Sequence, residues 1–182
     1  MGAGRFRGRF PRILEGARMK QLRFTFILTT LLIMLLIFLF SSQNAEKSTE
    51  LSNSVGYQIS SLTIRDFDQL PPVEQKIYVV SIDHIVRKYA HASEFLLLAL
   101  SLSAMFLSFL WRRKMDWLCF LLGWVFTLLY AVTDEIHQLF VPGRACMATD
   151  VLIDGAGAAL GILLFCLIYF LIRPLIFPSI KA

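Results

Sequence analysis

Ionisable and amide side chains are concentrated between Thr133 and Gly161, a stretch that lies between two apolar runs. They are four carboxylates, a histidine, a glutamine and an arginine: Asp134, Glu135, Asp150, Asp154, His137, Gln138 and Arg144. An earlier group recurs every three or four residues, which places it on one face of a helix: His84, Arg87, Lys88, His91 and Glu94. Carboxylates and imidazoles can transfer protons, and cations can bind an anionic group. The two groups therefore predict a polar site with acid–base capacity.

The elements that must position these side chains are apolar helices. Hydrophobic residues make up 57% of the 182-residue chain, and four segments are nearly free of charge: 24–40, 92–111, 116–133 and 151–172. About 20 helical residues cross a hydrocarbon core about 30 Å thick, and backbone groups in lipid must bond within their own segment. We therefore predict an all-α integral membrane protein with four transmembrane helices. The first segment is longer than the apolar core of a signal peptide, so we expect it to be retained.

A long polar segment separates the first two predicted spans. Within it Leu51, Val55, Ile59 and Leu62 recur at helical spacing, while Ser, Asn and Gln fill many of the positions between them. This pattern is typical of an amphipathic helix at a membrane interface. The pair Pro71-Pro72 ends one element and suits the first turn of the next. We expect the segment to be external and partly helical.

The distribution of cations predicts the orientation. Residues 1–23 carry six Arg and one Lys against a single Glu, and a second cationic segment, 111–117, lies two spans later on the same side. Arg173 and Lys181 follow the fourth span. By the positive-inside rule, both termini are cytoplasmic and the polar groups face outward. The chain then divides into a basic cytoplasmic extension, 1–23, and a four-helix membrane domain, 24–182. Contact with phospholipid explains the net charge of +5, and we expect no nucleic-acid partner.

The two polar groups are expected to meet. Pro142-Gly143 fits the central pair of a type II turn, which brings the end of the third span back to the start of the fourth. Gly157 and Gly161 form a small-residue surface that lets another helix come close. Glu94 and Asp154 lie deepest of the acids. A carboxylate there is costly unless it faces the bundle interior and finds a partner.

Two further expectations concern single acids. Asp134 and Glu135 are neighbours in sequence, so we expect only one of them to point into the bundle, whereas the other would lie at a solvated helix end. Asp83 stands outside the predicted spans, and we expect it to be an ordinary loop charge.

Two sequence blocks resemble a known family. RKYAHASEF, at Arg87–Phe95, and DEIHQLFVPGRACMATDVLIDGAGAALG, at Asp134–Gly161, are similar to the signature blocks of the VanZ-like membrane proteins, which are named for a teicoplanin-resistance accessory protein. The matching positions are Lys88, His91, Glu135, Gln138, Pro142, Arg144, Asp150 and Asp154. Phe95 stands where many members have Tyr. The resemblance covers about Ser41 to Leu164 and implies a cell-envelope membrane protein that lowers susceptibility to a glycopeptide, but it supplies no reaction.

Three kinds of function fit these residues. In an enzyme, an acid–base cluster would act on an anionic envelope lipid or lipid-linked cell-wall precursor; its members would be His91, Glu94, Glu135, Asp150 and Asp154, with Lys88, Gln138 and Arg144 binding the substrate. A non-catalytic binding protein would use the same side chains to hold the head group. A proton or ion transporter is less favoured, because the inner halves of the spans carry no ionisable residue.

A metal site is a narrower variant of the enzyme hypothesis. His91 and Glu94, joined by Glu135 or His137, would supply ligands of the kind that divalent ions accept. The sequence contains no tight ligand motif. We expect no metal and no cofactor.

Overall fold

A computed structural model describes residues 9–110 and 116–176. Within these ranges every regular element is helical: α1 (Arg9–Ser41), α2 (Ala45–Thr63), the 3-10 turn η1 (Phe67–Gln69), α3 (Pro72–Leu110), α4 (Asp116–Gln138) and α5 (Ala148–Ile176). Four helices contain a segment long and apolar enough to cross a membrane: Arg18–Ser41, Pro72–Leu110, Asp116–Gln138 and Ala148–Arg173. The predicted all-α fold with four spans is confirmed, and the chain is a multi-pass membrane protein.

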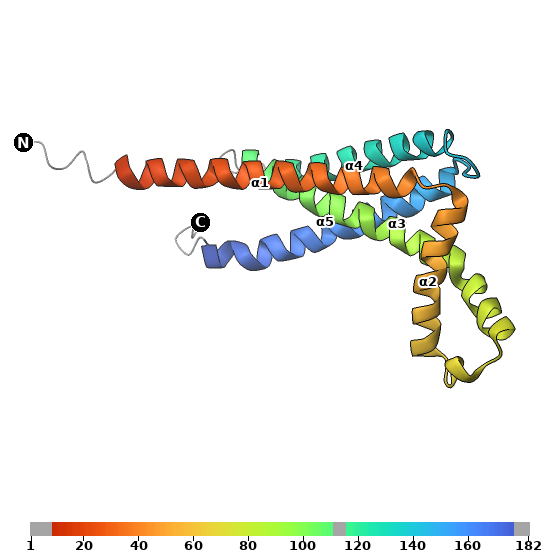
Figure 1. Ribbon diagram of the computed structural model, residues 1–182. Helices are drawn as coiled ribbons and strands as arrows, with labels where there is room; N and C mark the ends of the chain where they lie inside the picture. The colour runs from red at the N-terminus through yellow and green to blue at the C-terminus, as the bar shows by residue number, and fades with distance from the viewer. Residues whose placement is uncertain (1–8, 111–115, 177–182) are drawn as a thin grey trace, which may run out of the picture.

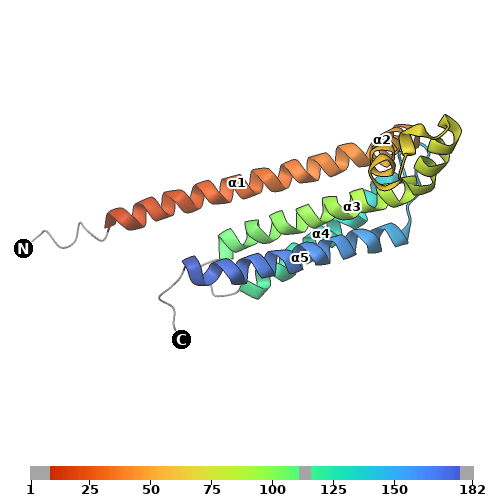
Figure 2. The same cartoon turned by 90° about the horizontal axis from the view of Figure 1, so that it is seen from below.

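Helix α3 occupies the centre of the molecule, where it contacts α1, α2, α4 and α5. The helices α1, α4 and α5 run alongside it (Figures 1 and 2). With 39 residues, α3 is about 58 Å long, which is well beyond the thickness of a hydrocarbon core. Pro72 starts the helix, and no breaker follows before the apolar run. The polar group His84–Glu94 and the second span therefore belong to one continuous helix.

Helix α2 projects from one end of the bundle and packs on the first half of α3 (Figure 1). The face of α2 that is buried consists of small residues: Ser52, Gly56 and Ser60. Its apolar residues lie beside that face and are exposed: Leu62 is 87% exposed, and Leu51, Val55 and Ile59 are exposed too. The expected amphipathic helix is thus present, and its apolar side chains are left largely uncovered by the protein.

Close backbone contact joins α3 and α5. A methyl group added to Gly157 would overlap the carbonyl oxygen of Ala92, and one added to Gly161 would lie 2.5 Å from the carbonyl oxygen of Leu96. Only glycine permits this approach, which is the one predicted from the small-residue surface. It fixes the start of α5 against the middle of α3, where the polar residues of both helices lie.

Some of the predicted cationic positions lie outside the described residues. These are residues 1–8 of the basic extension, residues 111–115 of the second cationic segment, and Lys181.

Candidate functional site

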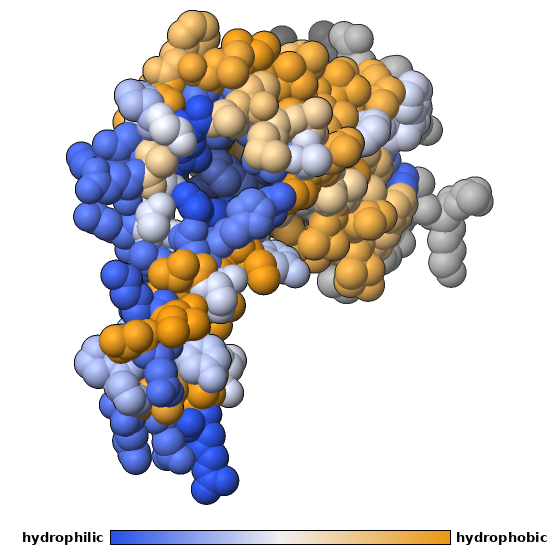
Figure 3. Space-filling model, turned by 90° about the vertical axis from the view of Figure 1, so that its right-hand side faces the viewer, coloured by the Kyte–Doolittle hydropathy of each residue, from blue (hydrophilic) through white to orange (hydrophobic). Residues whose placement is uncertain are grey.

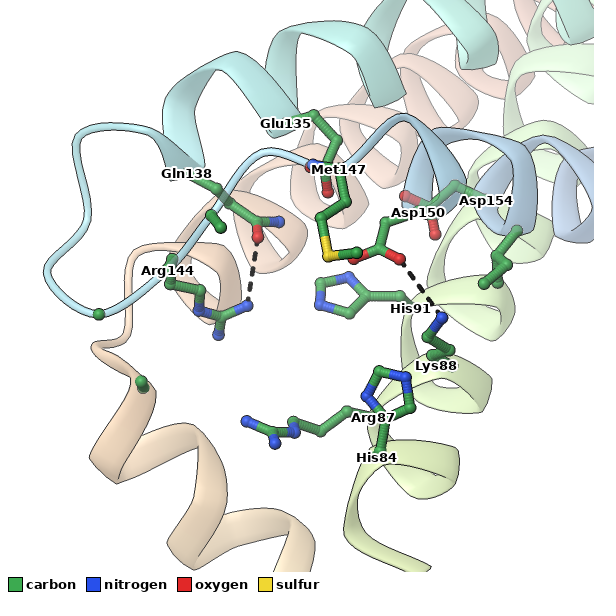
Figure 4. A pocket seen from close by; sticks show the side chains of 14 residues that line it. His84, Arg87, Lys88, His91, Glu135, Gln138, Arg144, Met147, Asp150 and Asp154 are labelled. Carbon is green, nitrogen blue, oxygen red and sulfur yellow. Dashed lines mark hydrogen bonds and ion pairs between the residues drawn. The ribbon is translucent and has the colours of Figure 1, made fainter.

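A polar cavity of about 200 Å³ lies at the end of the bundle where α3, α4, α5 and the α4–α5 loop meet. Figure 3 looks onto this end of the molecule, where hydrophilic residues gather around a hollow beside the hydrophobic surface of the bundle. The polar cavity has nine charged or amide residues in its lining: His84, Arg87, Lys88, His91, Glu135, Gln138, Arg144, Asp150 and Asp154. They point toward a common space from three helices and one loop (Figure 4).

The α4–α5 loop forms one wall through a tight turn at the predicted position. Gly143 has a φ of 77°, in the left-handed region that glycine adopts readily. The N–H of Arg144 donates to the carbonyl oxygen of Val141 at 3.1 Å, which closes the four-residue turn. The N–H of Ala45, at the start of α2, donates to the carbonyl oxygen of Pro142 at 3.4 Å. The turn therefore aims Arg144 into the space between α4 and the end of α1.

Arg144 is held by neutral oxygens. Its guanidinium donates to the carbonyl oxygens of Gln43 at 3.2 Å and Phe40 at 3.4 Å, and to Oε1 of Gln138 at 3.5 Å. Among the described residues, no carboxylate oxygen lies within the 4.0 Å that defines an ion pair with this side chain. Burial lowers the pKa of Arg144 and the charge of Arg87 lowers it further, whereas nearby carboxylates act in the opposite direction. Arg144 is therefore a partly desolvated cation that has no direct counter-ion in the part of the chain that the structure describes.

The two basic residues of α3 that line the polar cavity, Arg87 and Lys88, have acidic partners. Nζ of Lys88 lies 3.6 Å from Oδ1 of Asp150, which ties α3 to the start of α5. Arg87 forms an ion pair with Asp83, and Asp83 also accepts a hydrogen bond from Ser52 of α2. The expectation that Asp83 is an ordinary loop charge is wrong, since it is buried between the two helices. Its spacing of four residues from Arg87 was the signal that could have shown this.

Both neighbouring acids of α4 are buried. Asp134 is 4% exposed and Glu135 is 3% exposed, so the expectation that only one would point inward is wrong. Asp134 Oδ2 accepts from the Ser41 hydroxyl at 2.8 Å and from Nε2 of Gln138 at 3.1 Å. Glu135 Oε2 accepts the backbone N–H of Met147 at 2.9 Å. Neighbouring residues of a helix point in different directions. The Asp134 side chain therefore reaches the end of α1 and the Glu135 side chain reaches the α4–α5 loop, and each accepts a hydrogen bond there.

Asp154 lies at the floor of the polar cavity. The residue is 2% exposed, and its Oδ1 has no hydrogen-bond partner among the described residues. A buried polar oxygen without a partner is unfavourable, whereas a ligand or water that donates a hydrogen bond would satisfy it. Asp154 therefore marks the position where a bound group would contact the cavity floor.

Of the eight residues predicted to act in acid–base chemistry or in substrate binding, Glu94 alone does not line the polar cavity. It faces a second space of about 250 Å³, whose lining also includes Arg87, His91 and Arg144. Its Oε2 lies 3.6 Å from Nδ1 of His91 and has no hydrogen-bond partner among the described residues. His91 and Arg144 border both spaces, so they connect Glu94 with the other predicted site residues. The remaining seven line one cavity together, and their chemical roles stay a prediction.

Two features of the site were missed from the sequence. The end of α1 takes part through the hydroxyl of Ser41 and the carbonyl oxygens that hold Arg144. Ser41 is about 90 residues away from Asp134 along the chain, and no local pattern connects them.

His137 was proposed as a metal ligand together with His91 and Glu94. Its ring contacts Ser42 at 3.1 Å and lies against the ring of Phe38. Within the described ranges, no group of three or more His, Cys, Asp or Glu is arranged to hold a metal ion.

Comparison with known proteins identifies one related family. A model of the VanZ/LLP1 family matches residues 26–170, which is well over half of the chain and includes every residue that lines the polar cavity. No curated protein and no solved structure gives a significant match.

Proposed function

The chain belongs to the VanZ/LLP1 family, as its two sequence blocks predict, and from this premise we propose that its polar cavity binds the anionic head group of an envelope lipid or of a lipid-linked cell-wall precursor. The proposal rests above all on Arg144. Its guanidinium borders the cavity, is partly desolvated, and has no carboxylate in direct contact among the described residues. An arginine without a counter-ion gains more binding free energy from an incoming anion than an arginine that already pairs with a carboxylate.

The geometry of Arg144 suits a phosphate. A guanidinium carries five N–H donors in a planar fork, and neutral oxygens occupy three of them here. The remaining donors are available for a charge-assisted contact with a phosphate oxygen. Lys88, paired with Asp150 on the opposite wall, supplies a second positive charge. The neutral partners keep the arginine in place without neutralising it.

Orientation and biological role form part of the same proposal. We place both termini in the cytoplasm and the polar cavity on the outer side of the membrane, which the excess of Arg and Lys in residues 1–23 supports. A site on the outer side can reach lipid-linked cell-wall precursors. We propose that this binding lowers susceptibility to glycopeptides such as teicoplanin.

Acid–base catalysis is a second candidate, favoured by the acids on the cavity walls. Asp154 has an oxygen without a protein partner, and His91 and Glu135 line the same space. At a bound head group, one carboxylate or imidazole can take the proton of an attacking water or hydroxyl, and a protonated carboxyl group or imidazole can give a proton to the ester oxygen that leaves. The substrate would be the same lipid, with hydrolysis or group transfer as the reaction.

Lipid binding by the reconstituted chain tests the head-group proposal. Wild type is expected to prefer phosphatidylglycerol over phosphatidylcholine. Arg144→Gln removes a charge-assisted contact worth about 1.5–3 kcal/mol, so affinity for phosphatidylglycerol should fall about 10-fold to 100-fold. Arg65→Gln is the matched control, because Arg65 is almost fully exposed and pairs with Asp66. Both residues lie on the projecting arm, which consists of α2, η1 and the segment between them. Unchanged binding by Arg144→Gln would contradict the proposal.

Antibiotic susceptibility of a Gram-positive host separates binding from catalysis. The host would express wild type or the variants His91→Ala, Glu135→Gln and Asp154→Asn at matched membrane levels. If the site is catalytic, Glu135→Gln abolishes protection against teicoplanin while lipid binding is retained. If the site only binds, the same variant weakens protection in proportion to the lost affinity. If wild type gives no protection, the proposed role in antibiotic resistance is wrong. The head-group proposal is then tested by the lipid-binding assay alone.

A further inference from the structure

An apolar groove of about 680 Å³ runs between α3 and α5 directly beside the polar cavity. On α3 its lining follows one helical face down to Leu96, and on α5 it runs from Ile153 to Leu160. Lys88 to Leu96 spans eight residues, or about 12 Å along α3. Small side chains such as Ala92 and Ala156 leave the groove open. Its size falls within the range of small-molecule sites.

The groove and the polar cavity adjoin. Lys88 and Ile153 line both of them, so the side chain of Lys88 lies at their boundary. Tyr89, the next residue, lines the groove and is 75% exposed. Exposed tyrosines are common at the head-group level of a membrane. The groove thus begins at the expected level of lipid phosphates and extends toward the apolar centre of the spans.

We propose that this groove receives an acyl chain of the same lipid whose anionic head group occupies the polar cavity. The inference rests on the proposed function and deepens it, because it makes the ligand a membrane lipid whose acyl chain enters the groove from the bilayer. A soluble phosphate compound would fill the cavity alone and leave the groove empty. The head group then lies beside Lys88, and the chain runs past Ala92 and Ala156 toward Leu160.

An acyl chain fits this groove better than a peptide does. Both lining helices belong to membrane-spanning segments, so the groove opens toward hydrocarbon. An extended peptide would need hydrogen-bond partners for its backbone, and beyond Lys88 the lining offers only the side chains of Ser93 and Tyr89. A hydrocarbon chain has no such requirement and gains from every apolar contact.

Photo-crosslinking tests the inference. The full chain is reconstituted in phosphatidylcholine vesicles that contain phosphatidylglycerol with a diazirine on one acyl chain, and labelled peptides are identified by mass spectrometry. Ala156→Phe fills the groove from α5, and Ser93→Phe fills it from α3. Ala159→Phe is the matched control: the same substitution on the same helix fills a separate apolar hollow between α4 and α5, which shares no residue with the polar cavity.

We expect wild type to be labelled on the groove-lining residues of α3 and α5, and more strongly by phosphatidylglycerol than by phosphatidylcholine with the same diazirine chain. Ala156→Phe and Ser93→Phe should each reduce this labelling about tenfold, equivalent to losing about two buried methylene contacts. Ala159→Phe should leave it unchanged. Unchanged labelling in both groove variants, with melting temperatures like that of wild type, would overturn the inference. Equal labelling by the two lipids would also overturn it, because the groove would then hold any membrane chain.

The head-group proposal is judged separately, by the lipid preference of Arg144→Gln. If Arg144→Gln loses the preference for phosphatidylglycerol while the groove variants are labelled like wild type, the cavity binds the head group and the acyl-chain inference alone is wrong. If Arg144→Gln keeps the preference, the proposed function itself is wrong, and the inference falls with it.

Discussion

The contact between α3 and α5 at Gly157 leads to a quantitative prediction. Gly157→Ala places a methyl group against the carbonyl oxygen of Ala92, which belongs to the helix backbone and cannot rotate away. Overpacking of this kind costs about 1–3 kcal/mol, which outweighs the 0.5–1 kcal/mol that alanine gains over glycine within a helix. For a chain of this size each kcal/mol shifts the melting temperature by about 2–4 °C. We expect Gly157→Ala to melt up to about 10 °C below wild type.

Two other glycines provide matched controls. Apart from the nearby backbone of α1 itself, no atom of the described residues lies within 4 Å of a methyl group added at Gly16, so Gly16→Ala should favour the helix and melt at or slightly above the wild-type temperature. At Gly155 the nearest atom is the end of the flexible Leu128 side chain, 3.0 Å away, so Gly155→Ala should fall between the two. The assay is thermal unfolding of the purified chain in detergent, followed by size-exclusion chromatography. If Gly157→Ala melts like Gly16→Ala, the backbone approach described for α3 and α5 is incorrect.

Three further substitutions probe the ends of the helices around the polar cavity. Gly143→Ala forces an alanine into a φ of 77°, at about 1–2 kcal/mol, and should lower the melting temperature by several degrees. Asp83→Ala removes the partner of Arg87 between α2 and α3, so limited proteolysis should cut the projecting arm faster than in wild type while the bundle stays resistant. Ser41→Ala removes one of the two donors to Asp134 and should cost about 1–3 kcal/mol, again measured by thermal unfolding; no loss would mean that solvent replaces the hydroxyl.

The helices and the residue types of the site could be predicted from the amino-acid sequence. Apolar runs of sufficient length can only be helical in lipid, so four spans followed from their residues. The Pro142-Gly143 pair specified a turn because its glycine can adopt a positive φ, and that turn forms at this position. The three-to-four-residue spacing of Lys88 and His91 placed both on one face of α3, and both line the polar cavity.

How these helices are rotated against one another, and which partners each side chain contacts, depends on their packing in three dimensions. Periodicity gives the face on which a residue lies, but the direction of that face depends on packing, and here the contact at Gly157 sets it. For this reason Glu94 faces a second space, although its spacing matched that of the cavity residues. The end of α1 supplies Ser41 to Asp134, a contact between segments that no local pattern connects. The groove beside Lys88 likewise exists only because two distant helices approach closely there while their small side chains leave it open.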